Sequence, residues 1–280
     1  MYYRQLVILI GINAFLALAS YVPFSSGLLV VCLGTFMSAG AIVAAFAHST
    51  LGLPLPVAVM LGAFGGGVAG ACVGVACRQL GGFSFAMATL GIGELARIGV
   101  TNVEALGGAL GYRNVRMMTS LVDLGFFLGI LLGFFCLFEA SALRKAFAVV
   151  REDQTLASTL GIDIARHRIA ATTAAGFLAG IGGGFYVHAV GVLEPRMFGF
   201  ENSILILAYA IVGGARNFGG AFLAAIILTT VPEVLRFSMD LRMILYGVSL
   251  VLVVVLRPEG LLGTKATSAG GRLSKAFGRI

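Results

Sequence analysis

Charged side chains are scarce in this sequence, and one long stretch has none. Asp, Glu, Lys and Arg make up only 11% of the 280 residues, hydrophobic residues make up 59%, and the mean hydropathy is +1.01. No charged residue occurs between Arg4 and Arg78, an interval long enough for about three helical spans of about 20 residues. This composition excludes a water-soluble globular domain.

Alternation of apolar and polar residues is also missing, which excludes a membrane β-barrel because barrel strands alternate. The 40 glycines instead indicate helices that pack closely in lipid. We therefore predict an all-α polytopic membrane protein with about eight spans, including a broken or re-entrant hairpin. A single transmembrane domain is expected over residues 1–263, followed by a basic cytoplasmic tail over 264–280. The apolar runs cover residues 5–21, 27–47, 54–77, 83–100, 121–138, 169–190, 203–214, 218–231 and 241–256.

The patterns of a metal site or a nucleic-acid site are lacking. The cysteines have neither metal-like spacing nor histidine neighbours, so they are expected to be small buried apolar residues. They are Cys32, Cys72, Cys77 and Cys136. The net charge of +7 comes from basic residues in loops and in the tail, as in cytoplasmic segments of membrane proteins. We therefore predict contact with membrane lipid and no metal or nucleic-acid partner.

A polar island at residues 144–168 interrupts the apolar runs. It holds eight charged residues: Arg144, Lys145, Arg151, Glu152, Asp153, Asp163, Arg166 and Arg168. Its basic excess, like that of the tail from Arg257, predicts that both segments are cytoplasmic. Counting back from the island places residues 104–122 outside, 78–82 in the cytoplasm and the amino terminus outside. Arg4 argues against that last assignment, and a break of the second run at Gly34 would reverse it.

An even number of crossings must separate the cytoplasmic island from the cytoplasmic tail, so residues 203–231 contribute zero or two. The run 203–214 is only about 18 Å long as a helix, against a hydrocarbon core of about 30 Å. Glycines then interrupt it: Gly213, Gly214, Gly219 and Gly220. A broken or re-entrant hairpin fits both constraints and would lie near a pathway, because broken backbone needs protein or a water-filled cavity around it. A pair of simple short spans is the alternative.

The centre of the island predicts a short helix. Asp153 can cap a helix that begins at Gln154, and Gly161 can end it in a left-handed conformation. Its apolar residues are expected on one face: Leu156, Ala157 and Leu160. A helix of about two turns is marginal alone. Its apolar face is therefore expected to bind a soluble partner or, alternatively, to lie on lipid headgroups.

One ion pair is expected inside a span. Glu94 and Arg97 stand three residues apart, so they share a helix face. Charged side chains in a span usually face a cavity or each other. The pair therefore either lines a pathway or subunit interface, or is structural. His48 and His188 are expected to pack or to lie at the interface, and His167 to be solvated.

Four segments resemble branched-chain amino-acid ABC transporter permeases, most of all the M-type membrane subunit. The island and the next run read VREDQTLASTLGIDIARHRIAATTAAGFLAGIGGGFY, similar to the coupling loop and following helix of that family. The hairpin reads AYAIVGGARNFGGAFLAAIILTTVPEVLRF, and the last run reads LYGVSLVLVVVLRPEGLLG. Earlier, FAMATLGIGELARI resembles a further family segment. The resemblance covers most of residues 83–263 and is most specific in its last half.

The resemblance implies that the helix in the island seats in a groove on an ATP-hydrolysing subunit. Glu152, Ala157 and Gly161 then correspond to the coupling positions, and Asp153 and Leu160 complete the expected coupling segment. Two ATP-binding cassette subunits, a second homologous permease subunit and an extracytoplasmic solute-binding protein are the implied partners. The implied location is the bacterial inner membrane. The sequence has no GxxxxGK[ST] loop, so ATP and Mg²⁺ would bind to the cassette subunits and this chain would not be an enzyme.

The sequence departs from the family pattern where the solute is expected to pass. The second run carries Val30 and Leu33 where the family usually has Ser and His. Branched-chain or related amino acids remain the expected solutes, with urea, amides or small organic acids as alternatives. A stand-alone secondary transporter is the first rival, and a non-transporting membrane assembly subunit is the second. Secondary transporters usually carry several intramembrane acids and internal repeats, whereas this chain offers mainly Glu94.

Overall fold

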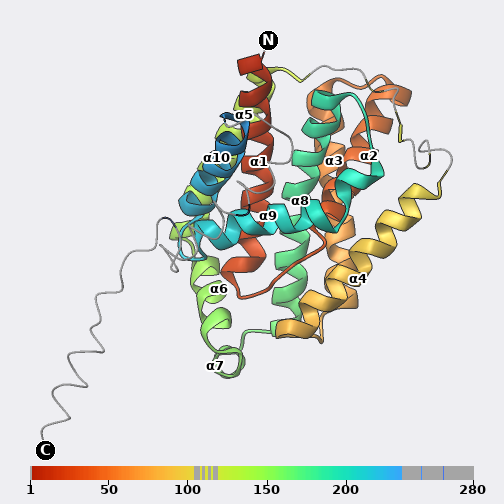
Figure 1. Cartoon of the computed structure of the whole chain (residues 1–280). Coiled ribbons are helices and arrows are strands. Elements are labelled where there is room, and N and C mark those ends of the chain that lie inside the picture. Colours follow the sequence, from red (N-terminus) through yellow and green to blue (C-terminus); the bar gives the residue numbers. More distant parts are fainter. Residues whose placement is uncertain are drawn as a thin grey trace, which may run out of the picture.

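The computed structural model describes residues 2–103, 108, 111, 112, 115, 119–234, 247 and 261 (Figure 1). Its elements are α1 Tyr2–Ser25, α2 Leu33–Leu51, α3 Leu55–Ala76, α4 Gly82–Thr101, α5 Leu121–Ala140, α6 Ala142–Glu152, α7 Gln154–Thr159, α8 Ile164–Val190, the 3-10 helix η3 Pro195–Phe198, α9 Phe200–Gly213 and α10 Phe218–Val234. These described residues form no strand, although Tyr112 and Leu193 make an isolated antiparallel bridge. The predicted run 241–256, apart from Gly247, and the tail 264–280 lie outside the described residues.

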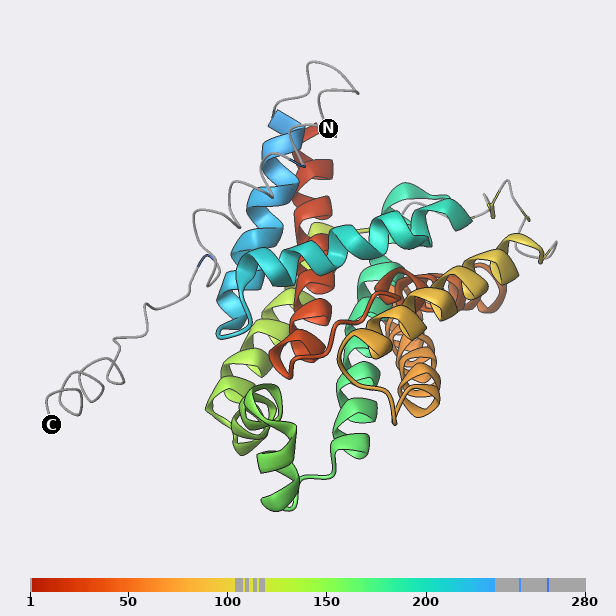
Figure 2. The ribbon, with the colours of Figure 1, turned by 60° about the horizontal axis from the view of Figure 1, so that its bottom comes forward.

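Within the described part of the chain, six helices are long and apolar enough to cross a membrane: α1 to α5 and α8. The protein is thus an all-α polytopic membrane protein, as predicted. The expected hairpin consists of two shorter helices, α9 with 14 residues and α10 with 17. Figure 2 shows α9 (teal) lying across α1, whereas α10 runs alongside α1.

Glycines bring α3 and α8 into direct backbone contact at the centre of the bundle. A Cβ atom on Gly66 would lie 2.8 Å from Gly180 Cα, and one on Gly176 would lie 3.0 Å from Gly70 Cα. A larger side chain at these positions would push the two helices apart. This arrangement confirms the close helix packing predicted from the glycine content.

The predicted second run is interrupted before α2. Residues 28–32 are largely buried but not helical. Side chains of distant helices bind two backbone amides here: Val31 N donates to Thr89 Oγ1 over 3.1 Å, and Gly34 N donates to Ser203 Oγ over 3.0 Å. Non-helical backbone is tolerated at this place because protein surrounds it. The sequence left open a break of this run at Gly34, and the structure places the non-helical stretch just before that residue.

The turn after α3 and the α6–α7 segment lie at one end of the bundle, and α1 begins at the other end (Figure 1). Arg168 joins the first two: its Nη1 donates to Arg78 O over 3.0 Å, and its Nη2 donates to Gln154 Oε1 over 3.0 Å. Residues 78–82 and 144–168 therefore share an end, as the count of crossings predicts.

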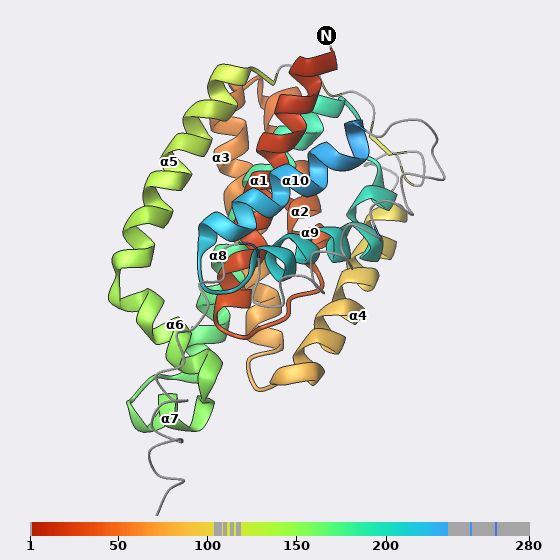
Figure 3. The same cartoon turned by 60° about the vertical axis from the view of Figure 1, so that its left-hand side comes forward.

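Helices α4 and α5 stand on different sides of the bundle (Figure 3). Most of their apolar residues are not buried within the chain. In each helix, only 17% of the most apolar 18-residue stretch is buried against the rest of the chain. On α5 the most exposed side chains include Val122, Phe126 and Leu137. In a membrane, faces of this kind contact lipid or another subunit.

Candidate functional site

The polar island contains a helix that the sequence pattern did not reveal, α6. The Ser141 hydroxyl stands at its start and accepts from Arg144 N over 3.4 Å. Phe147 and Val150, three residues apart, are buried against the bundle, and the rest of the helix is mostly charged or exposed. Ser141 as a possible N-cap, followed by the apolar pair Phe147 and Val150, was the signal in the sequence from which α6 could have been predicted.

The short helix α7 has the predicted ends. The Asp153 carboxylate accepts from Thr155 N over 2.7 Å and from Leu156 N over 3.2 Å. After the helix, Gly161 adopts φ +81°. Gly161 N donates to Ser158 O over 3.0 Å and Ile162 N donates to Ala157 O over 3.1 Å, which together form a Schellman motif. The cap at Asp153 and the left-handed glycine are confirmed.

The predicted common apolar face of α7 is wrong in one respect. Ala157 is 0% exposed and packs inside the chain, whereas Leu156 is 52% and Leu160 63% exposed. Consecutive helical residues are about 100° apart, so Leu156 and Ala157 can point in different directions. Leu156 and Leu160, with exposed Glu152 nearby, form the outward surface of this segment.

The start of α8 anchors both helices of the island. The His167 ring centroid lies 4.2 Å from that of Phe147 on α6, so His167 is a packing residue and not a solvated one. Arg168 is only 6% exposed and binds the α3–α4 turn and α7. Neither contact was predictable from local sequence, because the partners of His167 and Arg168 lie 14 to 90 positions away in the chain.

Glu94 and Arg97 form the expected ion pair, with Nε 2.8 Å from Oε2 and about a third of each side chain exposed. Glu94 Oε1 also accepts from Phe200 N over 3.0 Å. Phe200 is the first residue of α9, where free amides and the helix dipole favour a carboxylate. The pair therefore holds the start of α9, and Arg97 borders a cavity of about 160 Å³ between α2, α4 and η3.

All four glycines of the predicted break lie at or beside the turn between α9 and α10. Gly213 ends α9 and Gly214 has φ +87°. A Cβ atom on Gly220 would lie 2.9 Å from the carbonyl carbon of Gly213, so the two helices touch through their backbones. Asn217 Oδ1 accepts from Gly219 N over 2.9 Å at the start of α10. The glycines thus permit a sharp reversal.

A polar cavity of about 290 Å³ lies between α1, α2, α8 and α9. Its lining combines carboxylates and amides with apolar side chains: Asn13, Leu16, Met37, Tyr186, Glu194, Glu201, Asn202 and Leu205. Sequence reasoning missed this site because its residues come from four helices and from the connection after α8 that holds Glu194. Glu194 and Glu201, two acids in the short interval between apolar runs, were the visible signal.

His48 and His188, which the sequence presented as isolated residues, lie together. Their ring centroids are 5.1 Å apart, and their Nδ1 atoms lie 2.8 Å from Leu53 O and 2.7 Å from Gly184 O, respectively. These contacts agree with a packing role. Across the residues that the structure describes, no group of three or more His, Cys, Asp or Glu is placed to hold a metal ion.

Known proteins similar to this chain are transport permeases. The chain is 28% identical to the high-affinity branched-chain amino acid transport system permease protein LivM of Escherichia coli (strain K12) and 29% identical to LivM of Salmonella typhimurium. Each match covers 85% of this chain and 64% of the relative, so the chain spans less than two thirds of their length. A probable branched-chain amino acid transport permease protein, LivH of Methanocaldococcus jannaschii, is 27% identical over 48% of this chain and 45% of the relative.

No solved structure matches the chain. A family model described as the permease component of branched-chain amino acid transport systems matches residues 2–254, which is most of the sequence. The match includes the ion pair on α4, the island and the glycine break. The chain therefore belongs to the permease family of branched-chain amino acid transport systems.

Proposed function

We propose that this chain is a transmembrane subunit of an ATP-driven importer in the bacterial inner membrane and that it conducts branched-chain or related amino acids. Its expected partners are two ATP-binding cassette subunits, a second homologous permease subunit and an extracytoplasmic solute-binding protein. ATP and Mg²⁺ would bind to the cassette subunits, and this chain would perform no covalent chemistry. Family membership and the names of the relatives support the proposal.

The observation that carries the coupling role is the surface of the α6–α7 segment. Leu156 and Leu160 are exposed on a short helix that is capped at both ends and projects from the bundle (Figure 3). An exposed apolar pair on a projecting segment suits a groove on a soluble subunit. In this proposal Glu152, Leu156 and Leu160 contact the cassette subunit. Asp153, Ala157 and Gly161 keep the segment in shape.

The polar cavity beside α9 supports an amino acid as the solute. Carboxylates of Glu194 and Glu201 can attract the ammonium group of an amino acid, and the amide groups of Asn13 and Asn202 can bind its carboxylate. Leu16 and Leu205 offer apolar surface to a branched side chain. The cytoplasmic position of the carboxyl terminus is part of the same proposal, since the basic tail follows the last apolar run.

The test is to reconstitute the chain in vesicles with its cassette, second permease and binding-protein partners. Uptake of labelled leucine is then measured with and without ATP. Leucine uptake that depends on ATP and is competed by isoleucine and valine, but not by urea or amides, is expected. Uptake driven by an ion gradient without cassette subunits would contradict the proposal. Competition by urea, amides or small organic acids alone would contradict its solute.

A further inference from the structure

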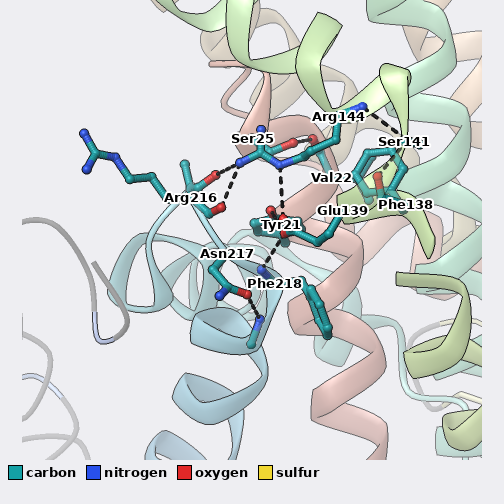
Figure 4. A network of polar contacts seen from close by, with 12 residues as sticks. Tyr21, Val22, Ser25, Phe138, Glu139, Ser141, Arg144, Arg216, Asn217 and Phe218 are labelled. Atoms are coloured by element: carbon teal, nitrogen blue, oxygen red, sulfur yellow. Dashed lines mark hydrogen bonds and ion pairs between the residues drawn. The ribbon is translucent and has the colours of Figure 1, made fainter. Parts of the chain in front are cut away.

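A network of charged and polar groups joins the α6–α7 segment, here called the cytoplasmic segment, to the glycine break between α9 and α10 (Figure 4). Arg144, in the first turn of α6, donates through Nη2 to Ala215 O over 3.2 Å and to Arg216 O over 2.8 Å. Both carbonyls belong to the turn between α9 and α10. The side chain of a residue 71 positions earlier thus holds the turn on which the hairpin reverses.

Glu139, at the end of α5, binds the other side of the same turn. Its Oε1 accepts from Phe218 N over 3.2 Å and from the Tyr21 hydroxyl of α1 over 2.8 Å. Its Oε2 lies 3.8 Å from Arg144 Nε. Four segments of the chain meet at this pair: α1, α5, α6 and the α9–α10 turn (Figure 4).

The charges are arranged to suit the two helix ends they touch. A helix carries free carbonyls and partial negative charge at its carboxyl end, and free amides and partial positive charge at its amino end. Arg144 binds carbonyls just after α9, and Glu139 binds the first amide of α10. The side chains of Arg144 and Glu139 are only 13% and 27% exposed, so water screens these contacts little.

The far end of α9 is also held by specific contacts. Glu94 Oε1 binds Phe200 N, and Ser203 Oγ binds Gly34 N. Between its two ends, α9 supplies Glu201, Asn202 and Leu205 to the polar cavity. Because its backbone hydrogen bonds keep a helix rigid, α9 can transmit a displacement from the contacts at one end to the contacts at the other.

We propose that Arg144 is the positioning residue that transmits movement of the cytoplasmic segment to the glycine break and thereby to the cavity wall formed by α9. This inference rests on the proposed transport function. When a cassette subunit displaces α6 and α7, the guanidinium group carries the displacement to the carbonyls of residues 215 and 216. Glu139 keeps the first turn of α10 aligned with α9 while the turn moves.

The test compares Arg144→Ala, Arg144→Lys and Glu139→Gln with the control Arg166→Ala. Arg166 belongs to the same island, but its side chain is 88% exposed and pairs only with exposed Asp163 in the described residues. Solute uptake and ATP hydrolysis are both measured in the reconstituted complex. Arg144→Ala is expected to lower the uptake per ATP hydrolysed by about tenfold. The variant loses the charge-assisted hydrogen bonds from the guanidinium group to the carbonyls of residues 215 and 216.

Arg144→Lys keeps the charge but not the paired donors, so an intermediate ratio is expected. Glu139→Gln keeps an acceptor for Phe218 N and is expected to lose less than Arg144→Ala. Arg166→Ala should match the wild type. If Arg144→Ala does not assemble, the ratios of the lysine and glutamine variants decide the question. A wild-type ratio in every variant that assembles would overturn the inference.

Hydrogen exchange of α9 and α10 distinguishes a transmitting role of Arg144 from a purely structural one. In the wild-type complex, ATP is expected to change exchange in both helices, whereas in Arg144→Ala the change should stay confined to α6 and α7. If ATP alters α9 equally in the variant, the inference is wrong. Failure of the wild-type complex to take up any solute would instead refute the proposed function.

Discussion

At the residue scale, single side chains fix the shape of the α6–α7 segment. Asp153 closes the start of α7 and Gly161 closes its end, while Arg168 ties Gln154 to the α3–α4 turn. A six-residue helix has too few internal hydrogen bonds to be stable alone. Its conformation therefore depends on these few groups, and substitutions at them should act on coupling before they act on insertion.

Asp153→Ala removes the acceptor for Thr155 N and Leu156 N, which should weaken the start of α7 by about 1 kcal/mol. Uptake is expected to fall, and proteases should cut the segment faster in inverted vesicles. Asp153→Asn keeps an acceptor oxygen and is the matched control. Equal protease sensitivity of the alanine and asparagine variants would contradict a capping role.

Gly161→Pro should uncouple transport while the protein still inserts in the membrane. Proline requires φ near about −65° and has no N–H, whereas Gly161 has φ +81° and donates to Ser158 O. Gly161→Asn, which tolerates the left-handed region, should keep most of the uptake.

Glu152→Arg reverses an exposed charge on the same segment and should also uncouple ATP hydrolysis from uptake. Normal uptake in both Gly161→Pro and Glu152→Arg would refute the role of this segment.

At the element scale, some glycines lie where two helices touch through their backbones, and others lie at open positions. Gly66 on α3 packs against Gly180 of α8, and Gly213 packs against Gly220 across the hairpin turn. On α5, by contrast, a Cβ atom at Gly129 would meet nothing within 4 Å. Glycines of the two kinds look alike in the sequence but should respond differently to substitution.

Gly66→Val should lower the thermal stability of the protein in detergent, because overpacking a tight contact costs about 1–3 kcal/mol. The same change at Gly129 is the control and should leave the melting temperature unaltered or slightly higher, since valine replaces a flexible residue at an open site. Melting is followed by thiol-reactive dye binding or by scattering. Equal effects at the two positions would argue against the close approach of α3 and α8.

Local patterns predicted the apolar helices, both ends of α7 and the glycine break, but not α6, because hydropathy and capping act over a few neighbouring residues. Contacts between distant segments were not predictable. Asn13 donates to Thr229 Oγ1 across 216 positions of sequence, and Glu139 and Phe218 are 79 positions apart. A break near Gly34 was open from the sequence, but the hydroxyl groups of other helices that bind the amides of Val31 and Gly34 were not predictable. Only the folded arrangement reveals such pairs.

At the scale of the whole molecule, the chain has two distinct ends and two open apolar sides. The island and the α3–α4 turn share one end, the start of α1 lies at the other, and α4 and α5 expose their apolar faces (Figure 3). A molecule with this surface has a fixed orientation in a membrane and needs lipid or other subunits along its sides. Its orientation is directly measurable.

Single cysteines in a cysteine-free variant should report this orientation. Asn102→Cys, at the end of α4, is expected to react with a membrane-impermeant thiol reagent in intact cells. Thr159→Cys, on exposed α7, should react only in inverted vesicles. Both side chains are exposed in the structure, so access and not burial decides the result. Labelling of Thr159→Cys from outside would invert the assigned topology.

The non-helical stretch before α2 has a consequence for how this protein can change over generations. Thr89 and Ser203 each offer a hydroxyl oxygen to a backbone amide that every residue except proline would present at positions 31 and 34. An unpaired buried amide is costly, so valine at 89 or alanine at 203 should be strongly selected against. Serine and threonine are the natural exchanges at these positions. Through these two hydroxyl oxygens, the sequences of α2, α4 and α9 are expected to be constrained together during evolution.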